Sequence, residues 1–198
     1  MRFEALSALN DEIRQTETCK DGRPVVINAL RPTQRYLIIS LDPSAETNKD
    51  RDLLVKHSGF EERVLALFEH GDDEPVSVAE VRTHYAQSKQ RFVDTFYWTH
   101  YSKCHHEGNP GDYWAKKYLQ REIELAEPEL IIAFGSRVTN FLLGGGTFKQ
   151  RVNQLLSTPE GIPLIASLHP SRDWNMRRRH EYAFKETWRL IRQQTNYI

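Results

Sequence analysis

The sequence predicts a single α/β domain, a three-layer α/β/α sandwich around a four-stranded parallel sheet. Short apolar runs alternate with segments of helical periodicity, as in parallel sheets that carry helices on both faces. The chain has 198 residues, a length that suits one domain over residues 1–198. It contains no internal repeat, low-complexity tract or obvious linker that would divide it.

The first third of the chain predicts a helix, a loop and a buried strand. Apolar residues recur at helical spacing within the first 20 positions. These residues are Phe3, Leu6, Leu9 and Ile13. Residues 21–35 hold a glycine and two prolines and predict a loop. Residues 36–41 form an apolar run that stops at Asp42, which indicates a buried strand that feeds a turn.

The remainder repeats this alternation. Further strands are expected at residues 95–99, 130–134 and 163–168. Helical patterns cover residues 112–126, 136–143 and 177–193. The three glycines at 144–146 follow a helical pattern, so we interpret them as its C-terminal stop rather than as a phosphate-binding loop.

The charge of the chain is balanced overall but not locally. Formal net charge is zero, with 39% apolar and 27% charged residues, which predicts a globular protein rather than a disordered one. Residues 61–80 carry seven acidic residues and one basic residue, whereas residues 172–192 carry seven basic and three acidic residues. These runs are either solvated helix faces or, for the second, a surface that faces phosphates.

The sequence predicts a cytoplasmic, monomeric protein without membrane contact. No apolar run is long enough to span a bilayer, and the first residues do not resemble a signal peptide. Cys19 and Cys104 are far apart and follow no disulfide pattern, which favours a reducing compartment.

Three chemically capable segments follow predicted strands. They are residues 42–44, 100–109 and 169–171. In open parallel sheets, ligands bind beyond the carboxyl ends of the strands. An acid, a polar loop and a histidine are therefore expected to converge at one edge.

Four blocks in this order carry a family resemblance. Residues 38–44 resemble the first motif of uracil-DNA glycosylases, a turn that presents an acid followed by proline. Residues 167–171 resemble the second motif, histidine-proline-serine, and residues 127–135 are similar to the third strand with its closing glycine. Lys103 and Cys104, followed by Asn109, resemble a segment of the iron–sulfur branch. The resemblance implies a uracil-DNA glycosylase-like fold and a DNA partner.

The resemblance implies two catalytic residues. Asp42 would stabilise the sugar cation and orient the attacking water, and a neutral His169 would donate a hydrogen bond to the departing base. The alternatives are a capping aspartate before proline and a packed structural histidine.

Other residues would bind the base and the DNA. Candidates for base binding are His100, Asn109, Leu54 and Leu41. Candidates for DNA binding are Pro43, Ser44, Pro170, Ser171, Arg172, Trp174, Met176 and Arg177. Trp174 either enters the duplex as a wedge, as apolar side chains do in bent DNA, or anchors its loop on the core.

The sequence also departs from the family. The iron–sulfur branch uses four cysteines, and this chain has two, so we expect neither a cluster nor another cofactor. The run Cys104-His105-His106 suggests zinc, but adjacent ligands seldom complete one tetrahedral site, so no metal is predicted. His100 and Leu54 stand where relatives have the base-reading asparagine and the stacking aromatic, which puts uracil specificity in doubt.

The sequence therefore favours a DNA glycosylase that excises a flipped uracil or another altered pyrimidine. Alternatives are a glycosylase for a bulkier modified base in foreign DNA, and an inactive nucleic-acid-binding module of the same fold. An unrelated small-molecule hydrolase would show no salt-dependent DNA binding.

Overall fold

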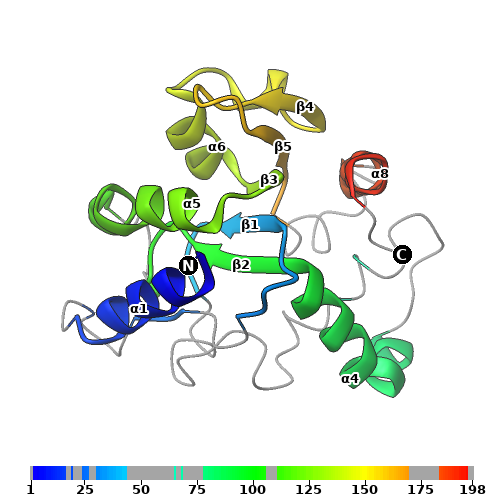
Figure 1. Ribbon diagram of the computed structural model, residues 1–198. Coiled ribbons are helices and arrows are strands. Elements are labelled where there is room, and N and C mark those ends of the chain that lie inside the picture. Colours follow the sequence, from blue (N-terminus) through cyan, green and yellow to red (C-terminus); the bar gives the residue numbers. More distant parts are fainter. Residues whose placement is uncertain are drawn as a thin grey trace.

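A five-stranded sheet forms the centre of the protein in a computed structural model (Figure 1). The structure describes residues 2–16, 19, 24–26, 30–43, 65, 68, 78–105, 111–169 and 183–195. The strands are β1 (Tyr36–Ser40), β2 (Phe96–His100), β3 (Leu130–Phe134), β4 (Gln154–Ser157) and β5 (Pro163–Ser167). They lie in the order β2-β1-β3-β5-β4.

Four of these strands, β1, β2, β3 and β5, are the predicted ones, and they pair with one another in parallel. The fifth strand corrects the prediction of a four-stranded parallel sheet. β4 pairs antiparallel with β5 at one edge, and Leu155 in it is 44% exposed. Edge strands with one paired side bury little apolar surface, so β4 lacks the continuous apolar run that identified the central strands.

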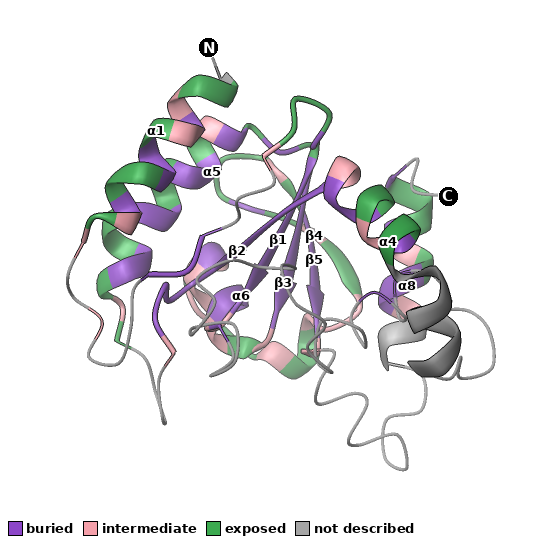
Figure 2. Cartoon of the chain, turned by 90° about the horizontal axis from the view of Figure 1, so that it is seen from below, coloured by how far each residue is buried: buried purple, intermediate pink, exposed green. Residues whose placement is uncertain are grey.

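Helices cover both faces of the sheet. They are α1 (Arg2–Arg14), α4 (Val78–Thr95), the π-helix η1 (Ala115–Leu119), α5 (Gln120–Ala126), α6 (Ser136–Leu143), the 3₁₀-helix η2 (Phe148–Gln150) and α8 (Ala183–Gln194). α1, α5 and α6 lie on one side, whereas α4 and α8 lie on the other (Figure 2). This confirms the three-layer α/β/α class. In the described part of the chain, none of the helices is both long and apolar enough to cross a membrane.

The burial of strands and helices explains which of these elements the sequence could predict. β1, β2 and β3 are buried along their whole length, as continuous apolar runs require. In α1, Leu6, Leu9 and Ile13 are buried as predicted, but Phe3 is 42% exposed and the helix ends at Arg14. The sequence missed α4, which lies beside an acidic run and leads directly into β2 without a turn residue.

Glycines end two elements as expected. Gly135, directly after β3, has φ +94, and Gly144 caps α6 with φ +70. Residues with a side chain rarely adopt a positive φ angle of this size, so glycine is favoured at both turns. The predicted helix stop at 144–146 is confirmed.

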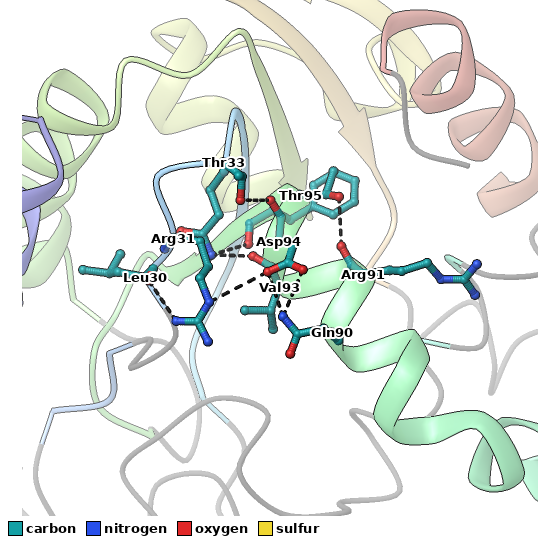
Figure 3. Close-up of polar contacts among 10 residues, drawn as sticks. Leu30, Arg31, Thr33, Gln90, Arg91, Val93, Asp94 and Thr95 are labelled. Carbon is teal, nitrogen blue, oxygen red and sulfur yellow. Dashed lines mark hydrogen bonds and ion pairs between the residues drawn. The ribbon is translucent and has the colours of Figure 1, made fainter.

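The junction of α4 and β2 is held by the segment that enters β1 (Figure 3). A helix end leaves its last carbonyl groups without partners in the helix. Here Gln34 Nε2 donates to Val93 O at 2.7 Å, Thr33 Oγ1 donates to Asp94 O at 2.7 Å, and Arg35 N donates to Thr95 O at 3.2 Å. Gln34 also donates to Phe96 O at 3.1 Å. These bonds cap the helix and align the starts of β1 and β2.

We expect a Gln34→Ala variant to lose about 1–3 kcal/mol of unfolding free energy, because buried carbonyls would lose their donor. Gln34 is 3% exposed, so water cannot readily replace its amide. Urea denaturation followed by circular dichroism measures the loss. Gln90→Ala is the control, because the exposed Gln90 amide bonds only to Asp94 of its own helix. A loss no larger than in the control would contradict this role.

Candidate active site

The carboxyl ends of β1, β2, β3 and β5 meet at one edge of the sheet, and backbone hydrogen bonds join the segments that leave them. Tyr101 N donates to Ser40 O and Ser102 N donates to Leu41 O, each at 2.8 Å. Gly135 N donates to Ser167 O at 2.8 Å. The parallel sheet thus places the first residue of each of the three predicted functional segments, Asp42, His100 and His169, along one edge, where such sheets bind ligands.

Asp42 lies two residues after the end of β1 and faces the segment after β2. Its carboxylate oxygen Oδ2 lies 3.7 Å from Nδ1 of His105, and its side chain is 22% exposed. His105 Nδ1 also lies 3.0 Å from the carbonyl oxygen of Pro43. A carbonyl only accepts hydrogen bonds, so Nδ1 carries the proton in this contact. His105 therefore braces the turn that presents Asp42, and the carboxylate stays accessible.

His100 is the last residue of β2 and is buried, at 1% exposure. Among the described residues, its Nδ1 has no hydrogen-bond partner. Burial, followed by the charges of Lys103 and His169, holds the pKa of His100 well below its usual range. The ring is therefore neutral at pH 7. A buried polar nitrogen without a partner is rare in native proteins, and a bound ligand or water is one way to satisfy it.

His169 leaves the sheet two residues after β5. Its ring meets the buried Phe134 ring edge to face, with centroids 5.8 Å apart. At the end of β5, Thr187 Oγ1 of α8 donates to Asn153 Oδ1 at 2.6 Å and lies within hydrogen-bond distance of Ser167 Oγ, at 2.9 Å. The end of β5 is thus anchored to α8, which fixes the backbone that leads to His169.

A buried polar network lies under the end of β2. Lys103 and Glu122 are both fully buried and form an ion pair with Nζ and Oε2 2.5 Å apart. Tyr97 Oη and Thr99 Oγ1 donate to Glu122 Oε1 at 2.8 and 2.9 Å. Burial and the Glu122 charge raise the pKa of Tyr97, so its hydroxyl remains a donor. The network satisfies a buried carboxylate that would otherwise be costly.

Asp112 links the segment after β2 to α6. Tyr101 Oη and Arg137 Nη2 each reach Asp112 Oδ1 at 2.6 Å. The Tyr101 hydroxyl and then Arg137 lower the pKa of Asp112 to about 2. The cluster ties the segment after β2 to the first turn of α6.

Cys19 and Cys104 form a disulfide, with Cα atoms 5.6 Å apart. This corrects the expectation that the two cysteines are unpaired. Their separation of 85 residues hid the pair, because only the fold brings the segment after α1 to the segment after β2. Two mutually bonded cysteines do not fit a four-thiolate cluster. Within the described ranges, no three histidine, cysteine or acidic side chains gather to hold a metal ion.

Reducing the disulfide should lower the free energy of unfolding by about 2–4 kcal/mol, because the closed loop is long. Urea titrations with and without dithiothreitol measure the difference. In a Cys19→Ser/Cys104→Ser variant the reductant should have no effect. Two reactive thiols in the untreated native protein would contradict the bond.

The structure describes only part of the predicted site. It brings Asp42, Pro43, His100 and His169 to one edge, and it shows that Leu41 uses its carbonyl to bind Ser102 N. The remaining candidates lie outside the described residues. They are Ser44, Leu54, Asn109, Pro170, Ser171, Arg172, Trp174, Met176 and Arg177.

The sequence missed three structural features of this edge. It placed His100 in a loop, whereas His100 ends β2 and is buried. It gave His105 no role beyond a metal ligand, although the Cys-His-His run marked the position. Pairing of Lys103 with Glu122 had no local signal, because 19 residues separate them.

Comparison with known proteins agrees with this geometry. The uracil DNA glycosylase superfamily matches the chain over residues 27–192. No curated protein matches it. The matched region contains every strand of the sheet and both Asp42 and His169. The chain belongs to the uracil DNA glycosylase superfamily.

Proposed function

We propose that the protein hydrolyses the N-glycosidic bond of a flipped uracil or another altered pyrimidine in DNA. Membership of the superfamily supports a glycosylase-type function in general. The observation that carries the proposal is the placement of an accessible Asp42 at the same sheet edge as His169 and a buried neutral His100.

The chemistry needs two groups on opposite sides of the breaking bond. Positive charge develops on the sugar, and the Asp42 carboxylate stabilises it and orients the attacking water. Negative charge develops on the departing base, and His169 donates a hydrogen bond to it. His105 acts on this reaction only by bracing the turn that holds Asp42.

The target base must leave the stack to reach this edge. We propose that Pro43, Ser44, Pro170 and Ser171 contact phosphates, with Arg172 and Arg177 as basic clamps. Trp174 or Met176 would fill the space that the base vacates. His100, together with Asn109, Leu54 and Leu41, would contact the flipped base.

A panel of labelled oligonucleotides tests the proposal. It holds uracil, hypoxanthine, xanthine, mismatched thymine and bulky modified cytosines, each in single and double strands. Abasic sites are scored by alkaline strand cleavage. Release of a pyrimidine supports the proposal. Release of only the bulky bases would move it to foreign DNA, and salt-sensitive binding without any release would indicate an inactive module.

We expect His169→Ala to lower the single-turnover rate by about 10²- to 10³-fold, the usual loss when a donor to a developing oxyanion is removed. His169→Gln keeps a donor and should retain more activity. Rapid-quench assays with saturating protein measure both rates. Equal rates for the alanine variant and the wild type would remove His169 from the mechanism.

A further inference from the structure

The buried lysine under β2 has no part in the proposed bond cleavage. Lys103 is fully buried, yet it lies only three residues beyond His100. A buried ammonium group is expensive unless every proton finds an acceptor. The hydrogen bonds of the Lys103 ammonium group therefore indicate its structural role.

Lys103 Nζ uses all three of its protons. It donates to Glu122 Oε2 at 2.5 Å, to Thr99 Oγ1 at 2.5 Å and to His100 O at 2.9 Å. The last bond closes the turn that follows β2, because the side chain folds back under the strand that it leaves. The Lys103 carbonyl oxygen also accepts a hydrogen bond from Val25 N at 2.7 Å. Both ends of the residue are thus fixed.

His100 depends on this turn for its position. The strand register pairs it with Ser40, and its ring packs near Trp98 with centroids 6.2 Å apart. Its Nδ1 makes no hydrogen bond within the described structure that could orient the ring. The backbone is therefore the main polar anchor of the residue, and Lys103 holds its carbonyl group.

We propose that Lys103 is a positioning residue that sets base specificity through His100, by fixing the backbone of His100 and placing a positive charge near the residue. This inference rests on the proposed function, in which His100 contacts the flipped base.

The charge has a chemical consequence. After burial, Lys103 is the largest cause of the lowered pKa of His100, and His169 adds to it. Glu122 carries the opposite charge and pairs directly with Lys103. It is not among the groups that shift the pKa of His100. A neutral imidazole nitrogen can accept a hydrogen bond, whereas an imidazolium can only donate. A neutral His100 keeps one acceptor nitrogen, which allows it to bind a base that presents an N–H or amino group.

The test compares the wild type with Lys103→Met/Glu122→Leu, which removes both buried charges together and avoids an unpaired one. Tyr97→Phe is the matched control, because it removes one bond to Glu122 and leaves all three Lys103 contacts intact. Titration of ¹³C-labelled histidines by NMR, with the His100 signal assigned from His100→Gln, reports the ring directly. Single-turnover kinetics use the panel oligonucleotide that the wild type cleaves fastest.

In the double variant, the His100 signal should shift and its midpoint should move to higher pH, because a positive neighbour is gone. The half-saturating protein concentration should rise about 3- to 10-fold, with a smaller change in maximal rate. Tyr97→Phe should leave both unchanged. An unmoved His100 titration, or the same change in Tyr97→Phe, would overturn the inference. A wild type that releases no base would instead refute the proposed function, while the titration would still decide the role of Lys103.

Discussion

An Asp42→Asn variant should release base about 10²- to 10⁴-fold more slowly than the wild type, while its fold and DNA affinity stay nearly unchanged. Asparagine has almost the same shape, so the turn braced by His105 should persist. It lacks the negative charge that stabilises the sugar cation and the basicity that orients water. The loss should therefore appear in the single-turnover rate and not in binding.

The measurement is rapid-quench kinetics with fluorescence anisotropy on the same oligonucleotide. Asp11→Asn is the control, because Asp11 is an exposed carboxylate on α1 whose ion pair is with Arg14. A variant with full activity would mean that Asp42 only caps its turn. A variant that loses DNA binding and activity together would mean that Asp42 is structural.

The second large effect concerns stability. Lys103→Met alone should lower the free energy of unfolding by about 3–5 kcal/mol, because Glu122 would remain buried as an uncompensated charge. Lys103→Met/Glu122→Leu should recover much of that loss, since both charges leave together. Some loss remains, because the hydroxyl groups of Tyr97 and Thr99 lose their acceptor.

Urea unfolding at pH 7 compares the three proteins. The account requires the single variant to be less stable than the double one. If the double variant loses as much as the single one or more, the ion pair contributes net stability and the desolvation argument is wrong.

The strands were predictable because parallel sheets bury both faces and so need unbroken apolar runs. The apolar runs at 36–41 and 130–134 predicted the bounds of β1 and β3 to within one residue. β4 was missed because an exposed edge needs no such run, and α4 because it passes into β2 without a break. Local pattern thus identified the core and not its margins.

The positions of the candidate residues were predictable where they follow a strand end. Asp42 and His169 each lie two residues after a parallel strand, so sequence order alone placed them at one edge. The bracing by His105, the Lys103–Glu122 pair and the Cys19–Cys104 bond depend on contacts between distant segments. No local pattern encodes such contacts, so they required the three-dimensional structure.

Under the proposed function, this sheet edge breaks an N-glycosidic bond. Mass spectrometry of the products tests it most directly, with oligonucleotides that each carry one altered base and with the wild-type and Asp42→Asn proteins in parallel. The account predicts a free base and an intact strand with one abasic site from the wild type, and neither from the variant within the same time. Full-length DNA with every base retained, at protein concentrations that saturate binding, would contradict it.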